Sequence, residues 1–445
     1  MYAFMTPCMS VQKVDPRLLQ KLDEFFSPHD DVSKIIAGYA KGYFFATKAE
    51  LQHAISTYLD VQGKEDKHWF GSIQTWDVSN VIDMSFLFEN NTRFNENLSS
   101  WDTSQVTDMS YMFFGASAFN QKLDFDTSSV TRMKGMFYGA ESFNQALKFN
   151  TSNVTNMSDM FKFAVSFNQP LNFDTSNVTT MRGMFEHAKA FNQQLDFDTS
   201  SVTDMQGMFH GAEVFNQELK FNTSQVTDMS YMFLEAFGFN QKLDFDTSNV
   251  TNMSDMFNTA VSFNQPLNFD TSNVTSMKGM FYMAEYFNQE LAFNTSNVTS
   301  MMGMFFGAVS FNQELDFNTS NVTTMRVMFS NATAFNQQLH FDTSNVTNMA
   351  YMFYRATAFN SPLHFDTSNV TTMRGMFKHA KAFNQQLDFD TSSLTNIYDM
   401  FTGCLPEQKL QFNTLRRNLP TLSEYKDQHR YVTHSLYDDL TLSKH

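Results

Sequence analysis

Aspartate side chains recur at a fixed spacing along this sequence, and carboxylates in such rows can bind divalent cations or a basic protein surface. They occupy two places in a repeated L-x-F-x segment, directly after the leucine and directly after the phenylalanine. The acidic residues at these places are Asp124, Asp126, Asp174, Asp196, Asp198, Asp244, Asp246, Asp270, Asp316, Asp342, Asp366, Asp388 and Asp390. We refer to them as the acidic strand face. Asp342, Asp366 and Asp390 follow one another at intervals of 24 residues, which makes them the first candidates for cation binding.

Two structural roles compete with binding at these aspartates. A charged face keeps a long repeat protein soluble, and an aspartate can accept hydrogen bonds from the turn that follows it. Carboxylates stacked at the strand spacing of about 4.8 Å also repel one another, which a basic partner would relieve. The favoured ligand is therefore a protein partner with a basic surface.

Histidines provide fewer candidate binding or catalytic positions than the aspartates do. His340 and His364 lie one unit apart beside Asp342 and Asp366, and this set is the one that could bind a transition metal. The remaining histidines of the repeats are scattered, with His187, His210 and His379 at variable positions of the expected helices. The sequence has no nucleophile elbow, phosphate loop, H-E-x-x-H motif or Cys/His ligand spacing. We therefore predict no catalytic residue, no metal site and no cofactor, and a protein that is not an enzyme.

The elements that must position these residues are set by an internal repeat. A valine marks the same place in each unit, with a first spacing of 25 residues and then of 24. The valines are Val81, Val106, Val130, Val154, Val178, Val202, Val226, Val250, Val274, Val298, Val322, Val346 and Val370, and Leu394 takes this place in the last full unit. Repeats of this length stack on one another into a solenoid of about fourteen units.

The pattern inside one unit predicts a strand followed by a helix. Leu171 and Phe173 alternate with polar residues, which is typical of a short strand with one buried face. A polar turn follows at residues 175–177, and Thr179 is an acceptable helix N-cap. The spacing of Met181, Met184, Phe185 and Ala188 then fits one face of a short helix. The sequence thus predicts an α/β repeat, with short strands in a parallel stacked sheet and the Met and Phe columns in a shared core.

The two ends of the chain depart from the repeat, and the sequence divides into three parts. Residues 1–75 are expected to form a helical N-terminal cap, with helices after Asp15-Pro16 and after the capping box at Thr47 and Glu50. Residues 76–403 form the solenoid. Residues 404–445 hold a degenerate last rung at 410–414, a C-terminal cap and a tail. Pairing of Cys8 with Cys404 stays open at this point.

Composition excludes several classes of protein. Phe and Met account for 51 and 31 of the 445 residues, which indicates that a few apolar positions recur many times. The formal net charge of −16 opposes binding to nucleic acid or to an anionic membrane. No apolar run reaches the roughly 18 residues of a spanning helix, and no signal peptide or anchor is visible.

The repeated phrases resemble those of the BspA-like leucine-rich-repeat surface proteins. The resemblance rests on WDVSNVIDMSFLF from Trp76, WDTSQVTDMSYMFFGASAFNQ from Trp101 and the many FDTSNVTxMxxMF units, and it covers roughly residues 46–403. It implies a leucine-rich-repeat solenoid, display on a cell surface and a role in adhesion. The compartment is otherwise unknown.

Two functions therefore compete. The first is a non-enzymatic interaction or adhesion scaffold that binds a protein partner through the acidic strand face. The second is a structural or assembly component that acts by its length and by self-association. Near-identical blocks favour the second, since TSNVTNMSDMF at Thr151 reappears at Thr247, four units later.

Overall fold

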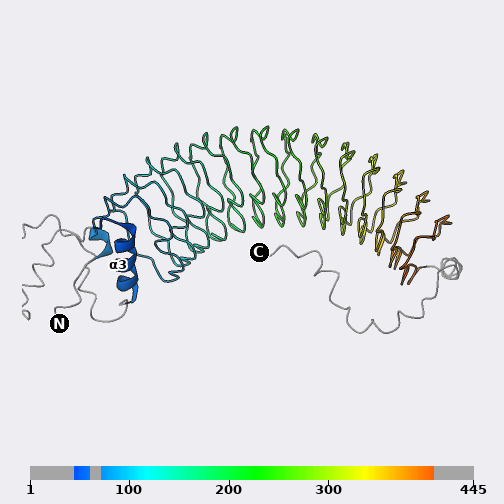
Figure 1. Ribbon diagram of the computed structural model, residues 1–445, viewed down its shortest axis with the longest axis horizontal. Coiled ribbons are helices and arrows are strands. Elements are labelled where there is room, and N and C mark those ends of the chain that lie inside the picture. Colours follow the sequence, from blue (N-terminus) through cyan, green and yellow to red (C-terminus); the bar gives the residue numbers. More distant parts are fainter. Residues whose placement is uncertain (1–44, 61–71, 405–445) are drawn as a thin grey trace, which may run out of the picture.

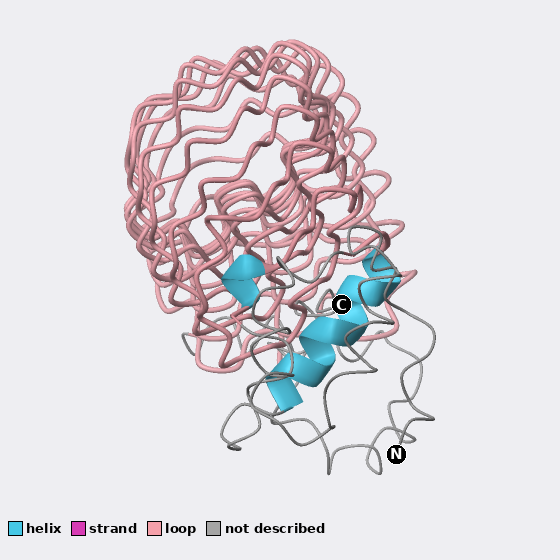
Figure 2. Ribbon diagram, turned by 90° about the vertical axis from the view of Figure 1, so that its left-hand side faces the viewer, coloured by secondary structure: helices cyan, strands magenta, loops and turns pink. Residues whose placement is uncertain are grey.

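The computed structural model describes residues 45–60 and 72–404. These residues form a curved solenoid, in which successive turns of the chain stack along an arc (Figure 1). Seen from the N-terminal end, the turns coil around a common interior and consist almost entirely of loops and tight turns (Figure 2). The repeated units are therefore the turns of one solenoid, here called rungs.

One rung can be followed from Asn168 to Phe191. Leu171 and Phe173 point inward, with 4% and 6% of their surfaces exposed, while the residue after each is exposed. A tight turn follows, closed by a 3.0 Å hydrogen bond from the Val178 amide to the Thr175 carbonyl. The chain then runs through residues 179–187, here called the ladder segment. The inward and outward alternation of the L-x-F segment is thus confirmed.

The continuous backbone ladder between rungs runs through the ladder segment. Isolated parallel bridges join one residue of this segment from rung to rung, from Asp83 at the first to Asn396 at the last. Within the described residues, bridges in the L-x-F segment are limited to three pairs, Leu195–Leu219, Leu315–Leu339 and Leu339–Leu363. The units stack in parallel as expected, but the continuous ladder lies in the ladder segment and not in the L-x-F segment, where the sequence predicted it.

The phenylalanine rings of the two segments also differ in their spacing between rungs. In the ladder segment, the rings of Phe185 and Phe209 have centroids 5.7 Å apart. In the L-x-F segment, the corresponding distance between the rings of Phe317 and Phe341 is 6.4 Å. The phenylalanine rings of neighbouring rungs thus lie closer together in the ladder segment.

The short helix predicted in each unit is not formed, because the ladder segment consists of consecutive turns. Residues 182–187 are all turn residues, and Gly183 and His187 have left-handed φ values of 58° and 54°. A helix would direct every amide to its own chain. Here the amides of Met181 and Phe185 instead donate to the next rung, to the carbonyls of Asp204 and Met208.

The Gly183 amide also donates to the next rung, to the Gln206 carbonyl, whereas the amides of Met184 and Glu186 close four-residue turns within the rung, as in the 3.1 Å bond from Met184 to the Met181 carbonyl. Thr179 is not an N-cap. Its amide and its hydroxyl both donate to the Thr155 carbonyl of the preceding rung, at 2.9 Å and 3.2 Å. The backbone polar groups are thereby satisfied without a helix.

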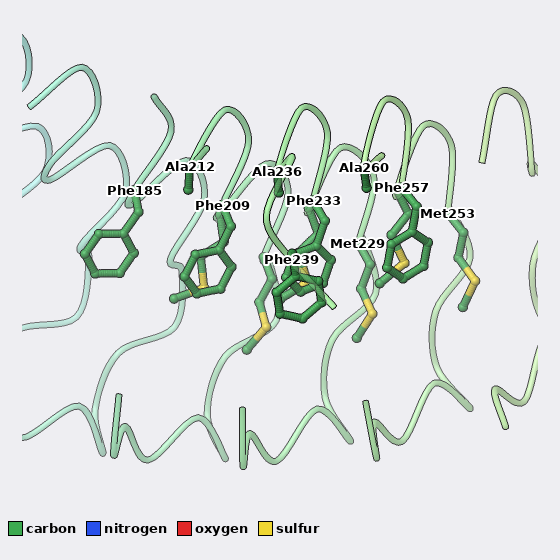
Figure 3. Packing of buried hydrophobic residues seen from close by; sticks show 14 of the residues in the cluster. Phe185, Phe209, Ala212, Met229, Phe233, Ala236, Phe239, Met253, Phe257 and Ala260 are labelled. Carbon is green, nitrogen blue, oxygen red and sulfur yellow. The ribbon is translucent and has the colours of Figure 1, made fainter. Parts of the chain in front are cut away.

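The Met and Phe columns form the shared core, as predicted. Phe185, Phe209 and Phe233 follow one another along the stack with no exposed surface, and Met229 lies beside them (Figure 3). Each ring also stacks on a second phenylalanine of its own rung, as Phe209 does on Phe215 at 4.2 Å. Aromatic pairs at such distances add to the stabilisation from apolar burial.

A ladder of asparagine side chains ties the rungs together at the corner that begins each unit. The Asn168 amide donates to Asn144 Oδ1 at 2.9 Å, and Asn168 Oδ1 accepts from the Asn192 amide at the same distance. The Gln193 side chain donates to the same oxygen at 3.0 Å. These half-buried side chains thereby satisfy backbone amides that the stacking of rungs withdraws from water.

Helix α3 (Lys48–Asp60) and the 3-10 helix η1 (Ile73–Thr75) precede the first rung. The capping box is formed, since Glu50 accepts from the Thr47 amide at 3.2 Å and Thr47 Oγ1 accepts from the Glu50 amide at 3.3 Å. Tyr58 packs against Trp76 with ring centroids 5.7 Å apart, and Lys48 bonds to Asp83 of the first rung at 3.1 Å. Helix α3 therefore contacts the N-terminal end of the stack (Figure 1).

Several sequence-based predictions concern the two ends of the chain. The helix expected after Asp15, the degenerate rung at 410–414 and Cys8 lie outside the described residues. Cys404 is buried, and its thiol donates to the Phe377 carbonyl at 2.8 Å. In the described ranges, no helix has the length and apolar character that crossing a bilayer requires.

Candidate functional site

All thirteen aspartates of the acidic strand face are exposed to solvent. Their position follows from the L-x-F alternation, which buries the leucine and phenylalanine and turns the next side chain outward. The aspartates after phenylalanine form one row along the stack, and those after leucine form a second. The structure therefore brings the acidic residues named from the sequence onto one long face.

Each aspartate of the first row also caps the turn that follows it. Asp342 Oδ1 accepts from the Ser344 amide at 3.0 Å and from the Ser344 hydroxyl at 2.7 Å. These hydrogen bonds hold the pKa of the Asp342 carboxyl below its usual value. The turn-capping role considered in the sequence analysis is thus present.

Asparagine performs the same capping in other rungs. Asn150 Oδ1 accepts from the Ser152 amide at 3.1 Å and from the Ser152 hydroxyl at 2.8 Å. Asn222, Asn294 and Asn318 do likewise in their own turns. The turn therefore needs a side-chain carbonyl oxygen but no negative charge. The charge of the acidic strand face exceeds what the fold requires.

This equivalence predicts that changing Asp342, Asp366 and Asp390 together to asparagine leaves the melting temperature at pH 7 within about 2 °C of wild type. At acid pH the stability of the wild type and that of the variant should differ. A carboxylate whose folded pKa is lowered stabilises the fold above its unfolded pKa of about 3.9, and this contribution is lost as the pH falls through the folded value. Thermal melts from pH 7 to pH 2.5 should show the wild type losing more stability than the variant, and equal losses would contradict the capping argument.

In the second row, formed by the aspartates after leucine, the negative charge is partly neutralised by lysines. Asp244 pairs with Lys242 at 2.8 Å, and the Lys220 side chain, which takes the place of aspartate in its rung, lies 3.8 Å from Glu218. Both pairs are well exposed, so each contributes little to stability. The first row is therefore the more uniform acidic surface.

The two histidines considered for metal binding in the sequence, His340 and His364, are not the ones that the fold brings together. Within the described residues, the one group of three or more side chains whose ligating atoms all lie within 4.8 Å of one another is Glu186, His187 and His210. His340 and His364 lie on the acidic strand face without forming such a group with their aspartates. In the sequence, this group could have been recognised from the 23-residue interval between His187 and His210, which is one residue shorter than the repeat.

The ladder segments carry a second surface that sequence reasoning assigned to a helix. Variable residues there project outward and include stacked rings such as Phe86 on Tyr111 at 4.9 Å and Tyr282 on Phe306 at 4.4 Å. Phe86 and Phe163 are 41% and 37% exposed. This face is therefore variable and partly apolar, unlike the acidic strand face.

A shallow groove of about 480 Å³ crosses three rungs at the end of their ladder segments. Its lining consists of Asn331, Thr333, Arg355, Thr357, His379 and Lys381. Burial, and then the charges of Lys378, Arg355 and Lys381, lower the pKa of His379. The groove is thus a basic spot on an acidic protein, and its residues were not singled out as a site from the sequence.

The family model described as "Mycoplasma protein of unknown function, DUF285" matches the chain six times in overlapping windows. The matched residues are 60–172, 123–220, 171–266, 195–289, 267–363 and 315–414, and together they span 60–414. No curated protein and no solved structure matches the chain. Because the matches cover every rung of the solenoid, the chain belongs to the DUF285 family of repeat proteins.

Proposed function

We propose that this protein is a non-enzymatic binding scaffold that receives a basic protein surface along its acidic strand face. The observation that carries the proposal is the surplus charge of the first row. Asparagine caps the same turn in four rungs, yet aspartate occupies eight others, including three consecutive rungs at Asp342, Asp366 and Asp390. A long acidic row attracts basic partners and speeds their association.

The finer assignment follows the resemblance to BspA-like leucine-rich-repeat surface proteins. It makes this chain an adhesion protein displayed at a cell surface, with the solenoid as a leucine-rich-repeat variant. The absence of recognisable catalytic motifs supports a binding role over an enzymatic one. Aspartate rows that exceed structural need support the choice of contact surface.

The test is a pull-down from the native source with three forms of the intact chain. The first is wild type. The second carries Asp342→Asn, Asp366→Asn and Asp390→Asn, which removes three charges and keeps each capped turn. The third is a matched control with Asp108→Asn, Asp204→Asn and Asp228→Asn, which removes three charges from the ladder segments. Asparagine occupies that same position in other rungs, where it accepts from the backbone as Asn252 does from the Ser254 amide at 3.0 Å.

A partner captured by the wild type and by the control, and lost by the acidic-strand-face variant, is the expected result. The captured complex should also weaken with salt, because exposed charges are screened over about 8 Å at physiological ionic strength. Equal capture by all three forms would overturn the assignment of the acidic strand face.

The second candidate function is a structural component that assembles with copies of itself. The copied blocks of units favour it, since residues 373–393 repeat residues 181–201 with Lys378 in place of Glu186 as the one change. Sedimentation velocity over a hundredfold range of concentration distinguishes the two functions. A sedimentation coefficient that rises with concentration supports assembly, and a constant monomer value removes it.

A further inference from the structure

Three side chains with ligating atoms meet at the surface of two adjacent rungs. Glu186, His187 and His210 each offer one such atom, and these atoms all lie within 4.8 Å of one another. All three side chains are half-buried. We propose that they form a binding site for a divalent first-row transition metal, with zinc as the representative ion. This site is separate from the acidic strand face and does not depend on the proposed function.

The ladder geometry produces this meeting. The His187 amide donates to the His210 carbonyl at 2.6 Å, which places the two residues side by side on neighbouring rungs. The left-handed conformation of His187, with φ 54°, turns its ring over the next rung. Gly211 leaves room for that ring, because a Cβ atom there would collide with His187 Nδ1. The two imidazole rings have centroids 4.5 Å apart and planes inclined by 54°.

The donor set selects the class of metal. Two imidazole nitrogens and one carboxylate oxygen suit zinc, nickel, copper or cobalt, whereas calcium and magnesium prefer oxygen ligands alone. Bonds of about 2.1 Å require ligating atoms roughly 3.4 Å apart in a tetrahedral site. The ligating atoms must therefore approach one another by at most about 1.4 Å on binding, and the remaining position would be filled by water, as in zinc sites with three protein ligands.

The charges around the group are compatible with a bound dication. Glu186 Oε1 lies 3.3 Å from His210 Nδ1, and Glu186 Oε2 lies 2.8 Å from Lys162 Nζ. Burial alone would raise the pKa of Glu186, but hydrogen bonds from His210 and Lys162 lower it below its usual value. Burial, together with His210, lowers the pKa of His187. Metals bind ionised carboxylates and neutral imidazoles, so both pKa directions favour the ligating forms.

Lys162 makes a distinctive contribution. Its ammonium orients Glu186 by holding Oε2, but its positive charge also repels a cation bound at Oε1. Replacing Lys162 by glutamine should therefore strengthen metal binding. A purely structural cluster would show no such gain.

The chain contains an internal control for this site. The copied block places His379 over Gly403 in the way that His187 lies over Gly211, with the same collision for an added Cβ atom. Lys378 takes the place of Glu186, and Thr402 takes the place of His210. The same backbone geometry therefore recurs there without the other two ligands. Among the residues that the structure describes, the full set of three ligands occurs at one pair of rungs.

The experiment measures zinc binding by the full chain at pH 7.5, in competition with a chromogenic chelator. Wild type is compared with His210→Gln, with Lys162→Gln and with the control His379→Gln. We expect one zinc ion to be bound at least about tenfold more weakly by His210→Gln, a loss at the lower end of that seen when supporting residues of metal sites are removed. His379→Gln should match wild type, and Lys162→Gln should bind more tightly.

Folding is checked by comparing circular dichroism spectra and melting temperatures without metal. Other histidines of the chain can also bind zinc, so the difference between His210→Gln and His379→Gln is the decisive quantity. Cobalt gives an independent signal, because a visible absorption band with nitrogen ligands should appear in wild type and be reduced in His210→Gln alone. Equal zinc affinities for wild type, His210→Gln and His379→Gln would overturn the proposal.

Discussion

Replacing Phe209 by alanine is expected to lower the free energy of unfolding of the central rungs by about 3–5 kcal/mol. Phe209 has no exposed surface and stacks on Phe185 and Phe233 of the neighbouring rungs, each with ring centroids 5.7 Å apart. Removing the ring thus leaves a cavity at two rung-to-rung contacts at once. Because each rung contacts only its neighbours, the change should also weaken the coupling between the two halves of the solenoid.

Urea unfolding followed by circular dichroism tests this expectation. The variant should begin to unfold at lower urea, and its transition should broaden or split as the halves separate. Phe237→Ala is the matched control, since Phe237 belongs to the next rung but is 38% exposed, and its loss should change stability by about 0.5 kcal/mol or less. A similar shift for both variants would show that the phenylalanine column does not carry the stability assigned to it.

Alanine at Gly183 should destabilise the protein more than alanine at Gly207, although the two glycines hold the same position in adjacent rungs. Both have left-handed backbones, with φ values of 58° and 61°. Such a conformation costs an alanine about 1 kcal/mol, after allowance for its lower entropy in the unfolded chain. This backbone cost is common to both variants.

The surroundings of the two glycines differ. A Cβ atom at Gly183 would lie 2.6 Å from Asp159 Oδ1 and 3.1 Å from Glu186 Oε2, whereas at Gly207 the nearest neighbour would be His210 Cβ at 3.8 Å. We expect Gly207→Ala to cost about 1 kcal/mol and Gly183→Ala about 2–4 kcal/mol, since the clash adds to the backbone cost. Denaturant melts of the two variants give the difference directly. Equal losses would mean that the Asp159 side chain moves aside freely.

The pattern of left-handed residues has a wider meaning for this fold. Two residues per rung take this conformation, and one member of a vertical pair is often a glycine that accommodates the side chain above it, as Gly135 does for Tyr111. The variable ladder residues are thus constrained in pairs between neighbouring rungs. A search for functional positions in this family should treat such pairs together rather than one residue at a time.

Both the family assignment and the surface chemistry direct the search for function to residues outside the shared core. Family membership accounts for the repeats, but its description gives no activity. Function must therefore be sought in residues that the stacking does not need. The surplus charge at Asp342, Asp366 and Asp390 and the cluster at His187 and His210 meet that criterion, because other rungs adopt the same backbone with different side chains.

The sequence by itself determined the solenoid, its rung length, its core columns and the outward direction of the acidic strand face. These features depend on residues that recur in every unit, so each unit supplies the same evidence. Leu171 and Phe173 must be buried wherever their equivalents are, because every unit stacks on its neighbours in the same way. The stacking of units explains why these predictions hold.

Only the tertiary structure decided between a helix and a row of turns. The spacing of Met181, Met184, Phe185 and Ala188 places these side chains on one side in either conformation. The choice depends on where the amides find acceptors, and the carbonyls of the next rung supply them. The metal-ligand cluster was hidden for a related reason. His187 and His210 differ by one position within their units, and only the offset of the hydrogen-bond ladder between rungs places them side by side.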